Sequence, residues 1–98
     1  MARWKLRIEA RAEAEARAAF QWYQSRHPLA AERFEAALEA CIDAISDAPE
    51  RFPEVEPGVR RRLLLHRFPY AVLYRVVTEE VQVVAVTHLR RRPGYWRR

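Results

Sequence analysis

The strongest constraint on the fold lies in two consecutive strand-like segments that are apolar on both faces. Residues 70–77 read YAVLYRVV and residues 81–89 read VQVVAVTHL, with apolar side chains at odd and even positions alike. Successive side chains of a strand point to opposite faces, so these segments indicate central strands that are covered on both sides. Thr78-Glu79-Glu80 is the predicted turn between them. The fold must therefore provide cover for both faces of one sheet.

The N-terminal half provides cover for only one of those faces. Residues 4–10 alternate as a half-buried strand, and residues 11–26 then place their apolar side chains on one face of a helix. A second, amphipathic helix is predicted from Pro28 to about Asp47. Two helices form a hairpin with one apolar face, which can cover one side of a sheet. The other side must meet the C-terminal tail, a twin subunit or another protein.

The order of these elements predicts an α+β fold in a single domain, residues 1–98. Residues 48–58 hold three prolines and a glycine and are predicted to be a loop, followed by a further strand over residues 61–68. The order is strand, helix, helix, strand, strand, strand, with a helical hairpin packed on a small, mainly antiparallel sheet. Arg67 and Arg75 each interrupt an apolar strand. Because an unpaired buried charge is costly, Arg75 should have a carboxylate partner, from Glu79 or from a bound protein.

Cysteine content and hydropathy indicate the cellular setting. No segment is apolar for the ~20 residues that a membrane span needs, and the N-terminus lacks the apolar core of a signal peptide. Cys41 is the only cysteine, so no internal disulfide can form. It lies on the apolar stripe of the second helix, where it is predicted to be a small core residue. The expected location is the reducing cytoplasm, with no membrane partner.

Positive charge is concentrated in the C-terminal part of the chain. Residues 1–58 contain eight Lys and Arg against eleven Asp and Glu, whereas residues 59–98 contain ten Arg against two Glu. A cationic surface of this kind attracts nucleic acid or acidic protein partners.

Most classes of catalytic and cofactor site are excluded by the residues present. Ser25 and Ser46 are the only serines, and neither lies in a nucleophile elbow. Two glycines, at positions 58 and 94, are too few for a phosphate-cradling loop. Neither a metal nor a cofactor is expected, because the four candidate ligands lack metal-binding spacing: His27, Cys41, His66 and His88.

The remaining candidates gather at the C-terminal end of the sheet. His88 is either a structural histidine at a strand end or a general acid or base. The arginines at 60–62 and 90–92 are either solvated or form one patch that binds phosphates or carboxylates, and the two clusters can converge if their strands are neighbours. Tyr95 and Trp96 either fold back over the exposed sheet or anchor a partner.

The C-terminal sequence resembles a known family. RFPYAVLYRV at 67–76, followed by VQVVAVTHLRRRPGYW at 81–96, is similar to the RelE/ParE superfamily of type II toxin–antitoxin toxins, in its ParE-like, plasmid-stabilisation branch. The order of elements also fits that superfamily. The resemblance implies a small toxin paired with a cognate antitoxin of ParD type, as a homodimer or a toxin–antitoxin hetero-oligomer. The antitoxin would lie on the open apolar face, and its expected contacts are Arg62, Tyr74, Arg75, Val84 and Val86. The sequence does not say which face the helices cover, so Tyr74 and Val86 belong to the open face only if the helices cover the other one.

The resemblance leaves the target open. RelE-like members cleave messenger RNA on the ribosome and commonly carry an arginine two residues before the Val-Tyr pair of this strand; here that position is Ala71. If the chain were such an RNase, His88, Arg91 and Tyr95 would be the catalytic candidates. ParE-like members are associated with inhibition of DNA gyrase by binding, for which the expected contacts are Arg90, Arg91, Arg92, Tyr95 and Trp96. A third alternative is a non-toxic nucleic-acid-binding module.

Overall fold

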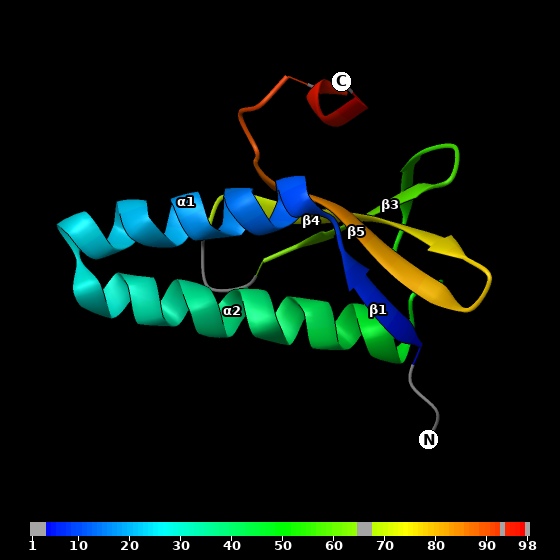
Figure 1. Ribbon diagram of the computed structural model, residues 1–98, viewed down its shortest axis with the longest axis horizontal. Helices are drawn as coiled ribbons and strands as arrows, with labels where there is room; N and C mark the ends of the chain where they lie inside the picture. Colours follow the sequence, from blue (N-terminus) through cyan, green and yellow to red (C-terminus); the bar gives the residue numbers. More distant parts are fainter. Residues whose placement is uncertain (1–3, 65–67, 93, 98) are drawn as a thin grey trace.

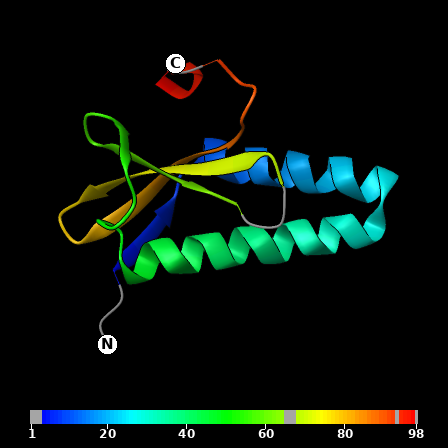
Figure 2. The ribbon, with the colours of Figure 1, turned by 180° about the vertical axis from the view of Figure 1, so that it is seen from behind.

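Two helices pack against one face of a five-stranded sheet (Figures 1 and 2), so the predicted α+β class is confirmed. The computed structural model describes residues 4–64, 68–92 and 94–97. His66 and Arg67 lie outside these residues. No helix in the described part of the chain has the length and hydropathy to cross a lipid bilayer. The elements are β1 (Lys5–Ile8), α1 (Ala10–Arg26), α2 (Pro28–Asp47), β2 (Glu54–Glu56), β3 (Val59–Leu63), β4 (Tyr70–Val77), β5 (Glu80–His88) and a 3-10 helix (Tyr95–Arg97).

The strands are arranged in the order β1-β5-β4-β3-β2. β1 runs parallel to β5, and every other neighbouring pair is antiparallel, as the sequence predicted for most of the sheet. The predicted second helix has the observed bounds, with Pro28 in its first turn. The tight β4–β5 turn also lies where it was expected, with Thr78 and Glu79 both at positive φ.

The predicted loop over residues 48–58 contains a strand, so that prediction is wrong in part. Glu54–Glu56 forms β2 and pairs with β3, which begins at Val59, two residues before the predicted start. Gly58 has a φ of 78°, a conformation that side chains with a Cβ adopt rarely. It lets the chain reverse within the Pro57-Gly58 turn. Pro53 therefore precedes a short hairpin and Pro57 lies in its turn, so this part of the segment is not an irregular loop.

The helices cover the face of β4 that carries Tyr70, Val72, Tyr74 and Val76. Tyr74 is fully buried there, together with Phe34 and Cys41 of α2. Its hydroxyl donates a hydrogen bond of 2.5 Å to the carbonyl oxygen of Pro49. This hydrogen bond holds the segment after α2 against the face of the sheet that the helices cover. Cys41 is a core residue, as predicted.

A β-bulge in β5 changes which side chains share a face. Leu73 pairs with Ala85 and Tyr74 pairs with Val83, so Val84 has no partner of its own on β4. Alternation is interrupted at this point. Val84 and Ala85 both lie on the uncovered face, packed with Leu73, whereas Val86 belongs to the core under the helices. The expectation that Val84 and Val86 share one face is therefore wrong.

We predict that Tyr74→Phe destabilises the fold by about 1–2 kcal/mol, because it leaves the Pro49 carbonyl without its buried donor. Urea unfolding measures the change. Tyr23→Phe is the matched control, since the Tyr23 hydroxyl makes no hydrogen bond with any residue in the described ranges. Equal stability of the two variants would show that the Tyr74 hydroxyl does not hold this segment.

Candidate functional site

The C-terminal tail folds back over the uncovered face of the sheet, on the side away from α2 (Figures 1 and 2). Gly94 has a φ of 79° and lets the chain turn into the 3-10 helix. Trp96 then packs against the small apolar cluster of that face. The tail thus covers part of the surface that two helices leave open, and the cluster consists of Val59, Leu73, Val84 and Ala85.

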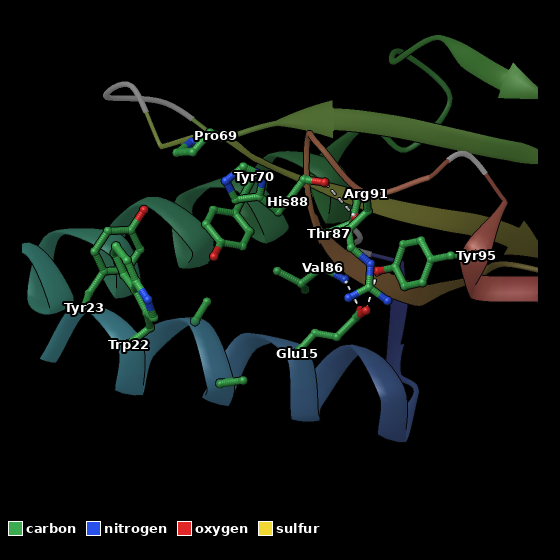
Figure 3. A pocket seen from close by; sticks show the side chains of 12 residues that line it. Glu15, Trp22, Tyr23, Pro69, Tyr70, Val86, Thr87, His88, Arg91 and Tyr95 are labelled. Atoms are coloured by element: carbon green, nitrogen blue, oxygen red, sulfur yellow. Dashed lines mark hydrogen bonds between the residues drawn. The ribbon is translucent and has the colours of Figure 1, made fainter. Parts of the chain in front are cut away.

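Glu15 of α1 holds the tail in this position. The Tyr95 hydroxyl donates a hydrogen bond to one Glu15 carboxylate oxygen, and the Val86 backbone N–H donates to the other at 2.9 Å (Figure 3). A guanidinium nitrogen of Arg11 donates to the Tyr95 carbonyl oxygen at 3.2 Å. The Arg91 guanidinium lies 3.9 Å from the centre of the Tyr95 ring. One carboxylate therefore joins a helix, the strand after its bulge, and the tail.

The phenol of Tyr95 is a hydrogen-bond donor and not a base. Burial raises the pKa of Tyr95 to about 12, and its hydrogen bond to Glu15 also acts in that direction. The phenol is neutral at physiological pH, and its proton points at Glu15. Any role of Tyr95 in proton abstraction would require the hydrogen bond to break first.

A cleft of about 520 Å³ lies between α1 and the ends of β4 and β5 (Figure 3). His88, Arg91 and Tyr95 line it together, so the fold brings together the three candidates for an RNase. The His88 ring packs edge-on against Tyr70, with 5.1 Å between ring centres. Its Nδ1 accepts a hydrogen bond from the Arg90 backbone N–H at 3.1 Å. In the neutral ring the proton is therefore on Nε2, which can act as a hydrogen-bond donor.

A second groove, of about 190 Å³, lies on the uncovered face beside Trp96. Arg61 of β3 lines it, together with Arg91 and Arg92 of the tail. The two arginine clusters therefore converge in part, although β4 separates their strands. The apolar lining includes Leu89, which is 50% exposed. This arginine-lined groove can bind carboxylates or phosphates beside an apolar group.

Several residues expected on the open face lie elsewhere. Tyr74 and Val86 are buried on the helix side, and the Arg62 guanidinium lies over the Phe52 ring on that side, 4.6 Å from its centre. None of the three lines the arginine-lined groove. Val84 does lie on the open face, beneath Trp96. Arg75 forms an ion pair with Glu9 at 3.2 Å instead of with Glu79, because β1 brings Glu9 beside it.

Comparisons with known proteins give the family. Residues 6–93 match the family described as "ParE toxin of type II toxin-antitoxin system, parDE". The chain belongs to this family. It is also similar to "Toxin RelE1" of Caulobacter vibrioides, with 32% identity over 68 residues, which cover 68% of this chain and 73% of that protein. A solved structure, "Chromosomal ParDE TA system from P. aeruginosa", shares the fold with a TM-score of 0.76 and 21% identity, over 87% of this chain and 95% of the other.

Glu15 is the residue of this ParE-family site that the sequence did not reveal. It follows Arg11 by four residues, a spacing that by itself indicates an ion pair on the solvent face of the helix, like the pair formed by Glu13 and Arg17 at 3.7 Å. In the structure Glu15 is half-buried and faces the sheet and the tail. Helical periodicity gives only the face on which a residue lies, and the contact with Tyr95 spans 80 positions.

We predict that Glu15→Ala destabilises the protein by about 1–3 kcal/mol, because two hydrogen bonds lose their acceptor. The tail should also loosen, which shifts the emission of Trp96 to longer wavelength in a background with Trp4→Phe and Trp22→Phe. Glu13→Ala is the control, since its carboxylate lies in an exposed pair. An unchanged Trp96 spectrum would contradict the role of Glu15 in holding the tail.

Proposed function

We propose that this toxin-family chain arrests growth by binding DNA gyrase, and that a cognate antitoxin of ParD type neutralises it by docking on the uncovered face. The observation that carries the proposal is the arginine-lined groove, in which Arg61, Arg91 and Arg92 outnumber the single carboxylate residue, Glu56, and lie among apolar side chains. Such a surface suits a protein partner that brings carboxylates and apolar side chains together.

The antitoxin proposal rests on what the helices leave uncovered. Val55, Leu63 and Leu89 are each at least 44% exposed, and all three lie around the open face of β3 and β4. Arg61, Arg91 and Arg92 provide positive charge at the same place. A flexible acidic segment that folds on binding would cover this surface and could be removed by proteolysis. The similar fold in P. aeruginosa comes from a ParDE system, which supports such a pairing.

Binding to a target protein explains the residues of the C-terminal tail better than cleavage of RNA does. Ala71 stands where RelE-like RNases commonly carry an arginine, and its methyl group cannot stabilise the charge that develops on phosphorus. The Tyr95 hydroxyl donates its hydrogen bond to Glu15, and His88 accepts a hydrogen bond on Nδ1. Target contacts are instead assigned to the exposed Arg90, Arg91 and Arg92, with Tyr95 and Trp96.

A second candidate function is cleavage of messenger RNA on the ribosome. It is favoured by the shared cleft of His88, Arg91 and Tyr95 and by the similarity to a protein named "Toxin RelE1". The gyrase and ribosome assays separate the two functions.

We predict that the purified toxin inhibits supercoiling by DNA gyrase, and that Arg90→Ala with Arg92→Ala weakens this inhibition at least tenfold. Both side chains are exposed, so the fold should be unaffected. Arg17→Ala with Arg33→Ala removes the same charge from the helices and is the control. Unimpaired supercoiling with discrete cuts in messenger RNA on programmed ribosomes would replace the gyrase proposal by the RNase.

We predict that Leu89→Asp raises the Kd for the cognate antitoxin at least tenfold, because it places a carboxylate where the acidic segment would dock. Leu29→Asp is a close control, since Leu29 is 49% exposed on the helical hairpin against 50% for Leu89. Titration calorimetry with the protein from the adjacent gene gives both constants. Equal loss in the two variants would show that the antitoxin does not use the arginine-lined groove.

A further inference from the structure

Strand β1 is a terminal strand of the sheet and leaves backbone groups unused. The N–H of Lys5 donates to the Glu79 carbonyl at 3.2 Å, and the N–H of Glu9 donates to the Val83 carbonyl at 2.9 Å. In a strand paired on one side, alternate residues direct their N–H and C=O groups to the partner and the others direct theirs away. Leu6 and Ile8 therefore direct theirs to the outer edge of the sheet. Unpaired edge groups of this kind are a template for a further strand.

The side chains of β1 divide by chemistry between the two faces. Leu6 and Ile8 pair with Val81 and Val83 and so lie on the helix side, where they are 44% and 37% exposed. Lys5 and Arg7 point to the opposite side and are exposed. No ion pair within the described residues involves either cation. The edge thus presents apolar groups on one face and positive charge on the other.

We propose that the outer edge of β1 binds an extended partner segment with alternating apolar and acidic residues, which adds a strand to the sheet. Side chains of neighbouring strands that lie side by side interact directly. The apolar residues of the segment would pack beside Leu6 and Ile8, and its carboxylates would lie beside Lys5 and Arg7. Backbone hydrogen bonds provide affinity in this mode of recognition, and the alternating side chains provide specificity. The proposal rests on the proposed function to the extent that this segment belongs to the antitoxin.

A second copy of the chain fits this edge poorly. If two β1 strands paired antiparallel, Lys5 and Arg7 of one copy would share a face with the same cations of the other, and like charges side by side are destabilising. If they paired parallel, the two faces would be reversed, and the cations of one copy would lie beside Leu6 and Ile8 of the other. The other terminal strand, β2, carries Glu54 and Glu56. Glu54 pairs with Arg60, which shares its face with the helix-side residue Tyr74. In a continuous sheet Glu54 would therefore lie beside Leu6 and Ile8, and only Glu56, which pairs with the open-face residue Val59, would lie on the side of the cations.

The β1 edge is also separate from the arginine-lined groove. The strand order places β1 at one end of the sheet, whereas the groove is built on β3, β4 and the tail. A partner bound at the groove does not by itself require contact with β1. The two surfaces can therefore be tested independently.

The test uses a synthetic peptide of eight residues that alternate Val and Glu. We predict that it slows hydrogen exchange at the Leu6 and Ile8 amides at least tenfold, as measured by NMR, because their free N–H groups gain an acceptor. The amides of Lys5 and Arg7 already face β5 and should change little. A peptide that alternates Val and Lys is the control and should give no protection.

Two variants distinguish a loss of peptide binding from a loss of folding. Leu6→Pro removes an outward N–H but no bond to β5, and proline is tolerated on edge strands. It should raise the Kd of the Val/Glu peptide at least tenfold at nearly unchanged Tm. Lys5→Glu with Arg7→Glu should transfer binding to the Val/Lys peptide. Absence of protection at Leu6 and Ile8 with millimolar Val/Glu peptide, or equal binding of both peptides, would overturn the proposal.

The same amides separate this inference from the proposed function. If the cognate antitoxin binds but Leu6 and Ile8 stay unprotected in the complex, the β1 proposal fails and the proposed function stands. If no antitoxin binds and the Val/Glu peptide still protects both amides, the proposed function fails and the β1 edge stands.

Discussion

The position of the C-terminal tail on the sheet depends on one carboxylate, that of Glu15. It accepts hydrogen bonds from the Val86 N–H and from the Tyr95 hydroxyl, and so it binds the sheet and the tail to the same turn of α1. A half-buried carboxylate with two donors satisfies both of its oxygens, which offsets part of the cost of its desolvation. Because Tyr95 is fixed, Trp96 is placed on the open face and Arg91 over the Tyr95 ring. Without the hydrogen bond between Glu15 and Tyr95, we expect Arg91 and Arg92 to be solvated instead of lining the arginine-lined groove.

The bulge in β5 determines which side chains of that strand lie on the open face beneath Trp96. Because Val84 has no partner on β4, Val84 and Ala85 both face the open side, and Val86 turns inward to the core. The bulge thus places apolar side chains against Trp96, and the Val86 N–H after it donates to Glu15. The same bulge therefore directs the Val86 side chain into the core, places Val84 and Ala85 under Trp96, and directs the Val86 N–H to Glu15.

Local patterns in the sequence predicted most of the architecture. The period of α2, the two-sided strands β4 and β5, and the turn at Thr78 are local features, and they lie where they were expected. The convergence of Arg61 with the arginines of the tail was expected only if their strands were neighbours. In the structure β4 lies between β3 and β5 and Arg61 lies in the middle of β3, so the path of the tail brings these residues together instead. Strand β2, the bulge and the contacts of Glu15 and Arg75 depend on register or on distant segments, which periodicity does not encode. Arg75 is an example: the sequence suggested Glu79 as its partner, but the structure pairs it with Glu9, because β1 lies beside β5.

The overlap of the proposed binding surfaces has a consequence for neutralisation. Arg91 and Arg92 line the groove assigned to the antitoxin, and they are also among the residues assigned to the target. An antitoxin docked there would remove those cations from the surface, so occlusion alone would block the target without a change of fold. A second contact at β1 would lie at the other end of the sheet and would add affinity without competing for the arginines. Two weak contacts joined by one flexible chain bind far more tightly than either alone, and proteolysis between them would return the toxin to its free state.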